Sequence, residues 1–98
     1  MAFSVSKEGD QVTIRLPEVF GFSVRSDFKK ATTGHSTSTS FFLDFRDVTR
    51  MDSSALGMLL LLRETSGGFY ADITIANVRP DIRKLLQLAN FHTLFKIQ

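Results

Sequence analysis

At the beginning of the chain, two short stretches alternate apolar and polar residues. Every second residue is apolar in residues 3–6 (Phe-Ser-Val-Ser) and in residues 12–16 (Val-Thr-Ile-Arg-Leu), which is the spacing of strands with one buried face. Between them, residues 8–10 (Glu-Gly-Asp) favour a turn. The pattern predicts a β-hairpin, whose second strand ends at Pro17 because proline cannot donate a ladder hydrogen bond.

Three further stretches carry apolar residues at helical spacing. The first, residues 24–31, has Ser23 as a candidate N-cap and Gly34 as a candidate C-cap. The second, residues 55–66, ends before a pair of glycines. The third, residues 80–90, begins with a proline, which a helix tolerates as its first residue. We therefore predict a helix over each stretch.

The stretches between these helices are mostly apolar or β-branched. Residues 41–45 (Phe-Phe-Leu-Asp-Phe) lack strict alternation, so we predict a central strand that is covered on both faces. Residues 72–78 and 94–97 predict two more strands. Residues 32–40 are almost all Thr, Ser and Gly and predict a mobile loop. We interpret this loop as a solvated connector, in preference to a phosphorylated or partner-contacting segment.

The predicted elements follow the order β-β-α-β-α-β-α-β. Strands separated by helices favour parallel pairing through right-handed crossovers, and the initial hairpin adds an antiparallel edge. The predicted fold class is therefore α/β, with a single mixed sheet and helices packed on it. The 98 residues have the size of one domain, so we expect residues 1–98 to form a single domain with nothing fused to it.

Composition and charge remove several classes of function. The absence of cysteine excludes disulfides, thiol nucleophiles and Cys-ligated metal sites. Twelve basic and ten acidic residues give a net charge of +2, which is too small to indicate a nucleic-acid partner. The longest apolar run, residues 58–62, is far shorter than the roughly 20 residues of a membrane helix, and the N-terminus lacks a secretory signal. We expect a cytoplasmic protein that does not insert into a membrane.

Two serines are candidates for nucleophilic catalysis. Ser53 and Ser54 lie where a strand leads into a helix, as the nucleophile of some hydrolases does. The Gly-x-Ser-x-Gly motif of those enzymes is absent, and the two histidines, His35 and His92, lie in segments with no predicted contact to the serines. We therefore expect a protein that is not an enzyme.

Metal and cofactor sites are not indicated either. Asp44, Asp47 and Asp52 lack the spacing of a calcium loop, and no glycine-rich motif that binds phosphate or a dinucleotide is present. We expect no metal and no cofactor, and we interpret Asp44 as a buried or capping residue.

One local motif remains, the Asp-Ser-Ser of residues 52–54 at the start of the second predicted helix. Asp52 and Ser53 are candidate caps, because short oxygen-bearing side chains accept hydrogen bonds from the first-turn N–H groups. The positive end of the helix dipole would also favour a phosphoryl group on a motif hydroxyl, which adds roughly −1.5 to −2 charges. The residues alone favour plain capping and leave phosphorylation open.

A resemblance to a known family is carried by residues 41–59, FFLDFRDVTRMDSSALGML. An apolar strand ending in Asp, a short loop with a buried Val and an Asp-Ser-Ser that opens a helix closely resemble the signature of the STAS domain. This family is named for sulphate transporters and anti-sigma-factor antagonists. The hairpin, the helix after Phe22, the strand at Ile73 and residues 90–95 also fall where the family has corresponding segments. The resemblance therefore extends over essentially the whole chain.

The resemblance implies a stand-alone anti-sigma-factor antagonist of a bacterial partner-switching pathway. When unphosphorylated, such a protein binds an anti-sigma factor, which is also a serine kinase of the histidine-kinase-like ATPase fold. Phosphorylation breaks the complex, and a PP2C-type phosphatase resets it. By the same resemblance the acceptor is Ser54, the second serine of the motif, with Ser53 as the reserve candidate. Asp52 would shape the loop and cap the helix.

The resemblance also places a partner-binding surface beside the motif. Met51, Ala55, Leu56 and Met58 are adaptable groups suited to such a surface. A phosphoryl group in their midst would add a desolvation cost to binding. Two positions depart from the family: Ala55 stands where Gly is usual, and Arg50 where an apolar residue is common. Arg50 either pairs with a phosphoserine or projects into solvent, and we favour the second.

Two other functions stay open. The chain could be a constitutive STAS-like accessory subunit of a lipid-transport ATPase complex. Members of that group often lack a usable serine, so the intact motif at residues 52–54 favours the switch. The chain could also be a ligand-sensing module that holds a nucleotide or lipid near the same helix start, although the sequence carries no pocket signature for it.

Overall fold

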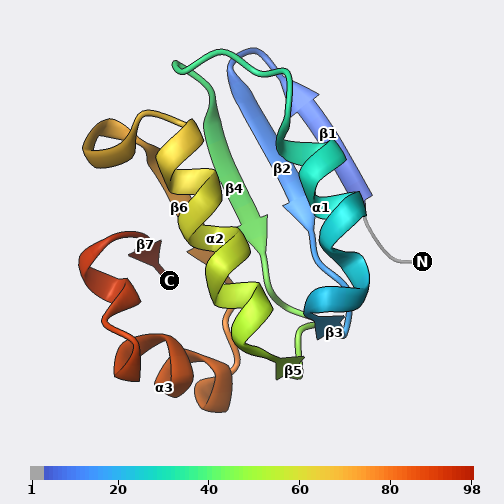
Figure 1. Cartoon of the computed structure of the whole chain (residues 1–98), viewed down its shortest axis with the longest axis vertical. Coiled ribbons are helices and arrows are strands. Elements are labelled where there is room, and N and C mark those ends of the chain that lie inside the picture. The colour runs from blue at the N-terminus through green and yellow to red at the C-terminus, as the bar shows by residue number, and fades with distance from the viewer. Residues whose placement is uncertain (1–3) are drawn as a thin grey trace.

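The structure is a computed structural model, and it describes residues 4–98. Its main sheet has five strands in the order β1-β2-β4-β6-β7 (Figure 1). β1 pairs antiparallel with β2, and the other neighbours pair parallel, which confirms the predicted hairpin and mixed sheet. Phe3, in the first predicted strand, lies outside the described residues. The strands are β1 (Ser4–Glu8), β2 (Gln11–Arg15), β4 (Ser40–Asp44), β6 (Asp72–Ala76) and β7 (Lys96–Ile97).

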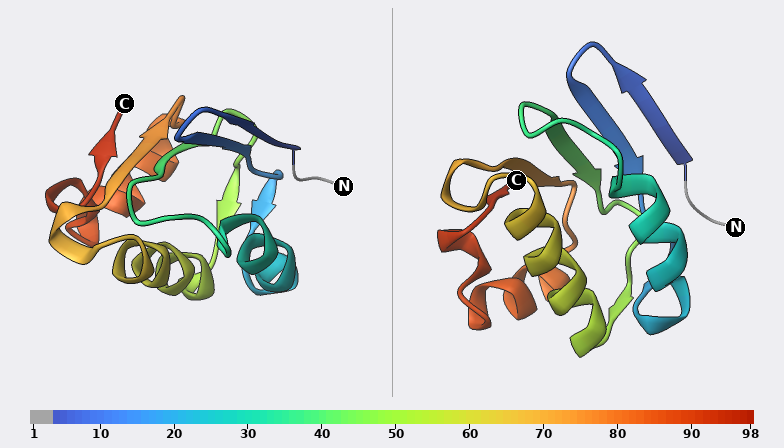
Figure 2. Two further views of the ribbon diagram at one scale, coloured as in Figure 1. Left: turned by 90° about the horizontal axis from the view of Figure 1, so that it is seen from above. Right: turned by 45° about the horizontal axis from the view of Figure 1, so that its top comes forward.

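The parallel strands are connected by α1 (Arg25–Thr32), α2 (Ser53–Thr65) and α3 (Pro80–Leu88). As predicted, α3 begins at its proline. Because the parallel strands follow one another in one direction across the sheet, right-handed crossovers place their helices on one face. Figure 2 shows α1 and α2 side by side against the sheet. Short 3-10 helices precede α1, β6 and β7: η1 (Phe22–Val24), η2 (Gly68–Tyr70) and η3 (Phe91–Thr93).

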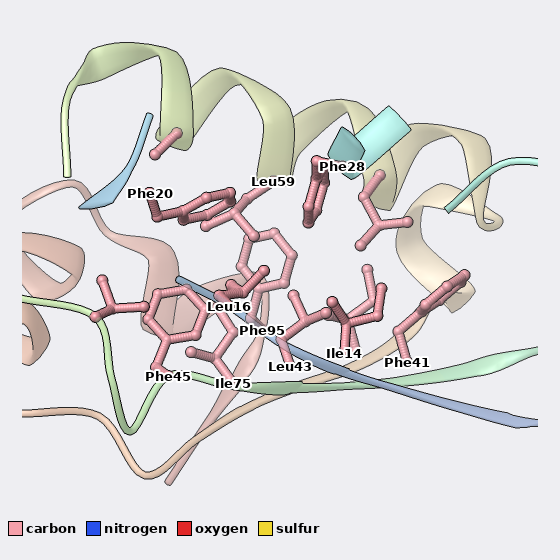
Figure 3. Packing of buried hydrophobic residues seen from close by; sticks show 14 of the residues in the cluster. Ile14, Leu16, Phe20, Phe28, Phe41, Leu43, Phe45, Leu59, Ile75 and Phe95 are labelled. Atoms are coloured by element: carbon pink, nitrogen blue, oxygen red, sulfur yellow. The ribbon is translucent and has the colours of Figure 1, made fainter. Parts of the chain in front are cut away.

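The hydrophobic core lies between the sheet and the helices (Figure 3). Alternate residues of each central strand are buried there, because successive side chains of a strand point to opposite faces. The helices add the apolar side of each turn. The strand residues of the core are Val12, Ile14, Phe41, Leu43, Ile73 and Ile75, and the helix residues are Phe28, Ala55, Leu59, Leu62, Ile82 and Leu86.

The opposite face of the sheet differs from our prediction for residues 41–45. Phe42 lies on this face between Thr13 and Thr74, its register partners, and all three are only half-buried. The prediction that β4 is covered on both faces is therefore wrong. The dense aromatic run misled it, because Phe41 and Leu43 face the core while Phe42 rests on the polar face.

A second, two-stranded sheet was not predicted from the sequence. β3 (Val19–Phe20) pairs parallel with β5 (Arg50–Met51), just before α1 and α2 begin. The adjoining cap predictions were wrong: Ser23 belongs to η1, and the N-cap of α1 is Val24, without a side-chain hydrogen bond. The C-cap of α1 is Thr33 rather than Gly34.

The Thr- and Ser-rich segment after α1 is less detached from the fold than a solvated connector. Thr39 is buried. The rings of His35 and Phe41 form a T-shaped contact, with 5.6 Å between their centroids. The Nε2 atom of His35 lies 3.1 Å from the carbonyl oxygen of Ala31. These contacts hold the segment against α1 and β4.

Candidate functional site

Asp52 directly precedes α2 and forms its N-cap, as predicted. Its backbone is extended, with φ −115° and ψ −178°, and its Oδ1 atom accepts a hydrogen bond from the Ala55 N–H at 3.2 Å. One of the free N–H groups of the first helical turn is thereby satisfied. The side chain itself remains exposed, so the cap leaves a carboxylate at the surface.

Asp52 also holds the segment that precedes α1. Its Oδ2 atom accepts a hydrogen bond from the Phe22 N–H at 3.2 Å. The neighbouring Gly21 makes this approach feasible, because a Cβ atom there would lie 2.5 Å from the same Oδ2 atom. The carboxylate therefore ties the starts of two helices together. This role of Gly21 was not predicted from the sequence, because it depends on a contact with a residue about 30 positions later in the chain.

Ser53 and Ser54 are the first two residues of α2, directly after the cap, so the prediction of Ser53 as a cap is wrong. Ser53 is exposed and Ser54 is half-buried. Within residues 4–98, neither hydroxyl has a hydrogen-bond partner. Both hydroxyls therefore lie, without a hydrogen bond to the described residues, at the positive end of a helix dipole, where added negative charge is favoured.

The residues that we predicted around this motif do not all reach the surface. Met51, Leu56 and Met58 are partly buried and Arg50 is exposed. Ala55 is fully buried in the core, so our placement of it on the partner-binding surface is wrong. An alanine directly after two serines gave no sequence signal of its direction, whereas the helical turn sets its Cβ against the sheet.

Two leucines extend the apolar surface of α2 beyond the predicted residues. Leu60 and Leu61 are 42% and 58% exposed, whereas Leu59 and Leu62 on either side are buried. A sequence signal for this exposure existed, because four consecutive leucines in an α-helix cannot all face one core. The candidate interaction surface therefore begins at Met51 in β5 and continues along α2 to Leu61.

Asp44, at the end of β4, is a structural residue rather than part of the exposed motif. It is 6% exposed and accepts hydrogen bonds from the Arg46 N–H, from Nε of Arg46 and from Nδ2 of Asn77, at 3.0, 2.9 and 3.0 Å. Burial raises the pKa of this carboxyl, but the hydrogen bonds and the Arg46 charge outweigh burial, so the pKa of Asp44 is lowered. These contacts confirm the interpretation of Asp44 as a buried aspartate.

The two histidines stand apart from the serines. His35 is bonded to the carbonyl of Ala31, and His92 is exposed in η3. In residues 4–98, neither ring is hydrogen-bonded to Ser53 or Ser54, and no group of three His, Asp or Glu side chains is placed to hold a metal ion.

The same part of the chain has no helix with the length and apolarity required to cross a bilayer.

Several known proteins are similar to this chain. A STAS-domain containing protein of Pseudomonas aeruginosa (strain UCBPP-PA14) is 44% identical over 93 residues, covering 94% of this chain and 92% of the relative. A Thermotoga maritima structure, provisionally described as an anti-sigma factor antagonist, has a TM-score of 0.81 at 20% identity, covering 97% of this chain and 84% of that one. Phosphorylated SpoIIAA from Bacillus has a TM-score of 0.69 at 21% identity, covering 99% of this chain and 91% of that one.

The structural likenesses establish the fold, and the sequence comparison establishes the family. The mixed sheet with its three helices matches the fold of the SpoIIAA structures. The family model described as "Mlab, STAS domain" matches residues 3–97. Because this match covers nearly the whole sequence, the chain belongs to the STAS domain family.

Proposed function

We propose that this protein is a phosphorylation-controlled binding module that antagonises an anti-sigma factor. In the unphosphorylated state it binds an anti-sigma factor that is also a serine kinase of the histidine-kinase-like ATPase fold, in the cytoplasm. Phosphorylation of Ser54 releases it, and a PP2C-type phosphatase restores binding. Support comes from membership of the STAS family and from the similar fold of SpoIIAA, which is described as an anti-sigma factor antagonist and has structures in unphosphorylated and phosphorylated forms.

The observation that carries the proposal is the placement of the Ser54 hydroxyl. Ser54 is half-buried and lies in the first turn of a helix with an apolar surface, and its hydroxyl has no hydrogen bond within residues 4–98. A phosphoryl group there is favoured by the helix dipole and therefore need not unfold the helix. It brings roughly −1.5 to −2 charges, which a partner covering Met51, Leu56 and Met58 would have to desolvate.

Ser53 is the reserve acceptor, and its exposure separates the two serines. A phosphoryl group on exposed Ser53 stays in solvent, whereas one on half-buried Ser54 lies closer to the apolar surface of α2. We therefore expect the larger effect on partner binding from Ser54. A loss of about 3 kcal/mol would weaken the complex more than a hundredfold, enough for an on/off response.

Mass spectrometry of the protein from its native cell tests the acceptor directly. We expect phosphate on Ser54 that disappears when the partner kinase is deleted. Absence of phosphate from both serines under all growth conditions would refute the switch. A pull-down of Ser54→Ala, Ser54→Asp and the phosphoprotein tests release. The matched pair Ser53→Ala and Ser53→Asp is the control, and we expect only the Ser54 charge to prevent capture.

A second candidate function is that of a permanent subunit, for example in a lipid-transport ATPase complex. The observation in its favour is the exposure of Leu60 and Leu61, which continue the apolar surface of α2 away from the serines. A permanent interface would bury these leucines and ignore the charge of Ser54. Copurification of the same partner with Ser54→Ala and Ser54→Asp, in equal amounts, would favour this candidate over the switch.

A further inference from the structure

A cavity of about 520 Å³ opens between α1, α2 and the segment that follows α1. Small-molecule sites have volumes of roughly 300–1,000 Å³, so the cavity has the size of a ligand pocket. Phe28, Phe41 and Leu62 form buried parts of its lining, and Met58 and Leu61 add apolar side chains from α2. The interior is therefore suited to an apolar group.

The charged side chains of the cavity all have one sign. Arg25 and Lys29, one helical turn apart on α1, line it, and no Asp or Glu does. Lys29 is exposed and forms no ion pair within residues 4–98. The guanidinium of Arg25 lies 4.4 Å from the centroid of the Phe22 ring, a cation–π contact that leaves its charge uncompensated by a carboxylate. The cavity therefore has a cationic side beside an apolar interior.

Most of the lining hydroxyls are already used by the protein; within residues 4–98 the exception is the hydroxyl of Ser66, which has no hydrogen-bond partner. Thr32 donates to the Phe28 carbonyl at 2.9 Å, and Thr65 donates to the Leu61 carbonyl at 3.1 Å. The Nε2–H of His35 points to the Ala31 carbonyl at 3.1 Å. Thr32, Thr65 and His35 therefore have little hydrogen-bonding capacity left for a sugar or a base. The two cations and the single Ser66 hydroxyl are the polar groups open to a ligand.

We propose that this cavity binds a small amphipathic carboxylate, with its apolar chain between α1 and α2 and its anionic group at Arg25 and Lys29. The site goes beyond the switch function and uses none of its serines. Met58 lies one helical turn after Ser54, so both sites share α2 while remaining separable by mutation.

Decanoate, below its micelle concentration, is a suitable probe, with binding followed by amide NMR spectra of the full chain. We expect shifts concentrated in residues 25–36 and 58–66. Two probes have the same ten-carbon tail as decanoate but a different head group. Uncharged 1-decanol and cationic decyltrimethylammonium should both bind more weakly than decanoate. Absence of binding, or equal binding of all three probes, would overturn the proposal.

A charge reversal on α1 locates the anionic group. Lys29→Glu should weaken decanoate binding at least about tenfold, while Lys30→Glu, an exposed neighbour outside the lining, should change it less than about twofold. The dispersion of the amide spectra shows that each variant is folded. Equal weakening by both variants would mean unspecific attraction to a basic helix and would refute the site.

A second matched pair locates the apolar chain on α2. Leu61→Asp should abolish the shifts, and Leu60→Asp, on the same helix but outside the lining, should preserve them. Partner capture by Ser54→Ala, measured separately, reports on the switch alone. The ligand site and the proposed function can therefore fail independently.

Discussion

Two aspartates bound the segment that joins β4 to α2, and the fold treats them in opposite ways. Asp44, at one end, is buried and accepts hydrogen bonds from a guanidinium, an amide side chain and a backbone N–H. Asp52, at the other end, is exposed, and in residues 4–98 its carboxylate accepts only the backbone N–H groups of Phe22 and Ala55. The charge of Asp44 is neutralised by Arg46, whereas the carboxylate of Asp52 forms no ion pair within residues 4–98.

The difference shows how one residue type serves two purposes. The Asp44 carboxylate is paired with Arg46 and bonded to Asn77, so we expect its role to be structural, holding these two side chains in place. The charge of Asp52 persists beside two free hydroxyls at the start of a helix. Removing Asp44 should therefore damage the fold, whereas removing Asp52 should chiefly alter the helix start.

The largest expected effect is that of Asp44→Ala. It removes the buried carboxylate that accepts three hydrogen bonds from Arg46 and Asn77, each worth about 1 kcal/mol, so we expect a loss of about 3 kcal/mol in the free energy of unfolding. Urea denaturation measures it. Asp47→Ala is the matched control, because Asp47 pairs with Arg15 while both side chains are about half exposed, 46% each. A loss in Asp47→Ala equal to that in Asp44→Ala would contradict the comparison.

The same contrast has a pH dependence. Because hydrogen bonds and Arg46 lower the pKa of Asp44 below its ordinary value despite burial, its carboxylate stabilises the folded state at pH above that ordinary value. This stability is lost as the pH falls through the lowered pKa of the folded state. Asp44→Asn should flatten the acid side of a stability profile, and Asp72→Asn, at a more exposed carboxyl, should flatten it less. Identical profiles for wild type and Asp44→Asn would contradict this assignment.

The next largest effect should come from Gly21→Ala. The new Cβ would lie 2.5 Å from Oδ2 of Asp52, so the carboxylate must move and lose a backbone N–H partner. We expect a destabilisation of about 2 kcal/mol in thermal or urea unfolding. Gly57→Ala is a control of opposite sign. Nothing lies within 4 Å of a Cβ at this helical position, and alanine there should stabilise by up to about 1 kcal/mol.

The smallest effect should be that of Asp52→Ala, which removes the cap of α2 and the acceptor of the Phe22 N–H. Because both Asp52 and Phe22 are exposed, water replaces the second bond, and we expect a total cost of about 1 kcal/mol. Asp52→Asn retains an acceptor oxygen and should cost only a few tenths of that value. Unfolding experiments on the pair separate the hydrogen bond from the charge. If Asp52→Ala were as damaging as Asp44→Ala, the two aspartates would not differ in the way that their burial indicates.

Local features of the fold could be predicted from the sequence. The hairpin follows from strict alternation around residues 8–10, and the start of α3 follows from Pro80, because these signals act over a few residues. The cap at Asp52 is local as well, since the side chain bonds to an N–H only three residues ahead.

Features that depend on distant contacts could not be predicted. The β3–β5 pair joins two-residue strands about 30 positions apart, too short to show alternation. Gly21 acquires its role only when Asp52 approaches it. The burial of Ala55 and the half-exposure of Phe42 depend on which way a turn or a strand faces, and an apolar run carries no signal for that direction.

The exposed edge strand β1 has a consequence for the order in which the protein opens. All five of its residues are exposed, although each pairs with a residue of β2. Detaching β1 uncovers almost no core, so its amide hydrogens exchange with solvent through a local opening of low free energy. The amides of β4, which has a parallel neighbour on each side and buried Phe41 and Leu43, exchange through openings close to global unfolding. In thermodynamic terms, the cooperative unit of this domain therefore begins at β2.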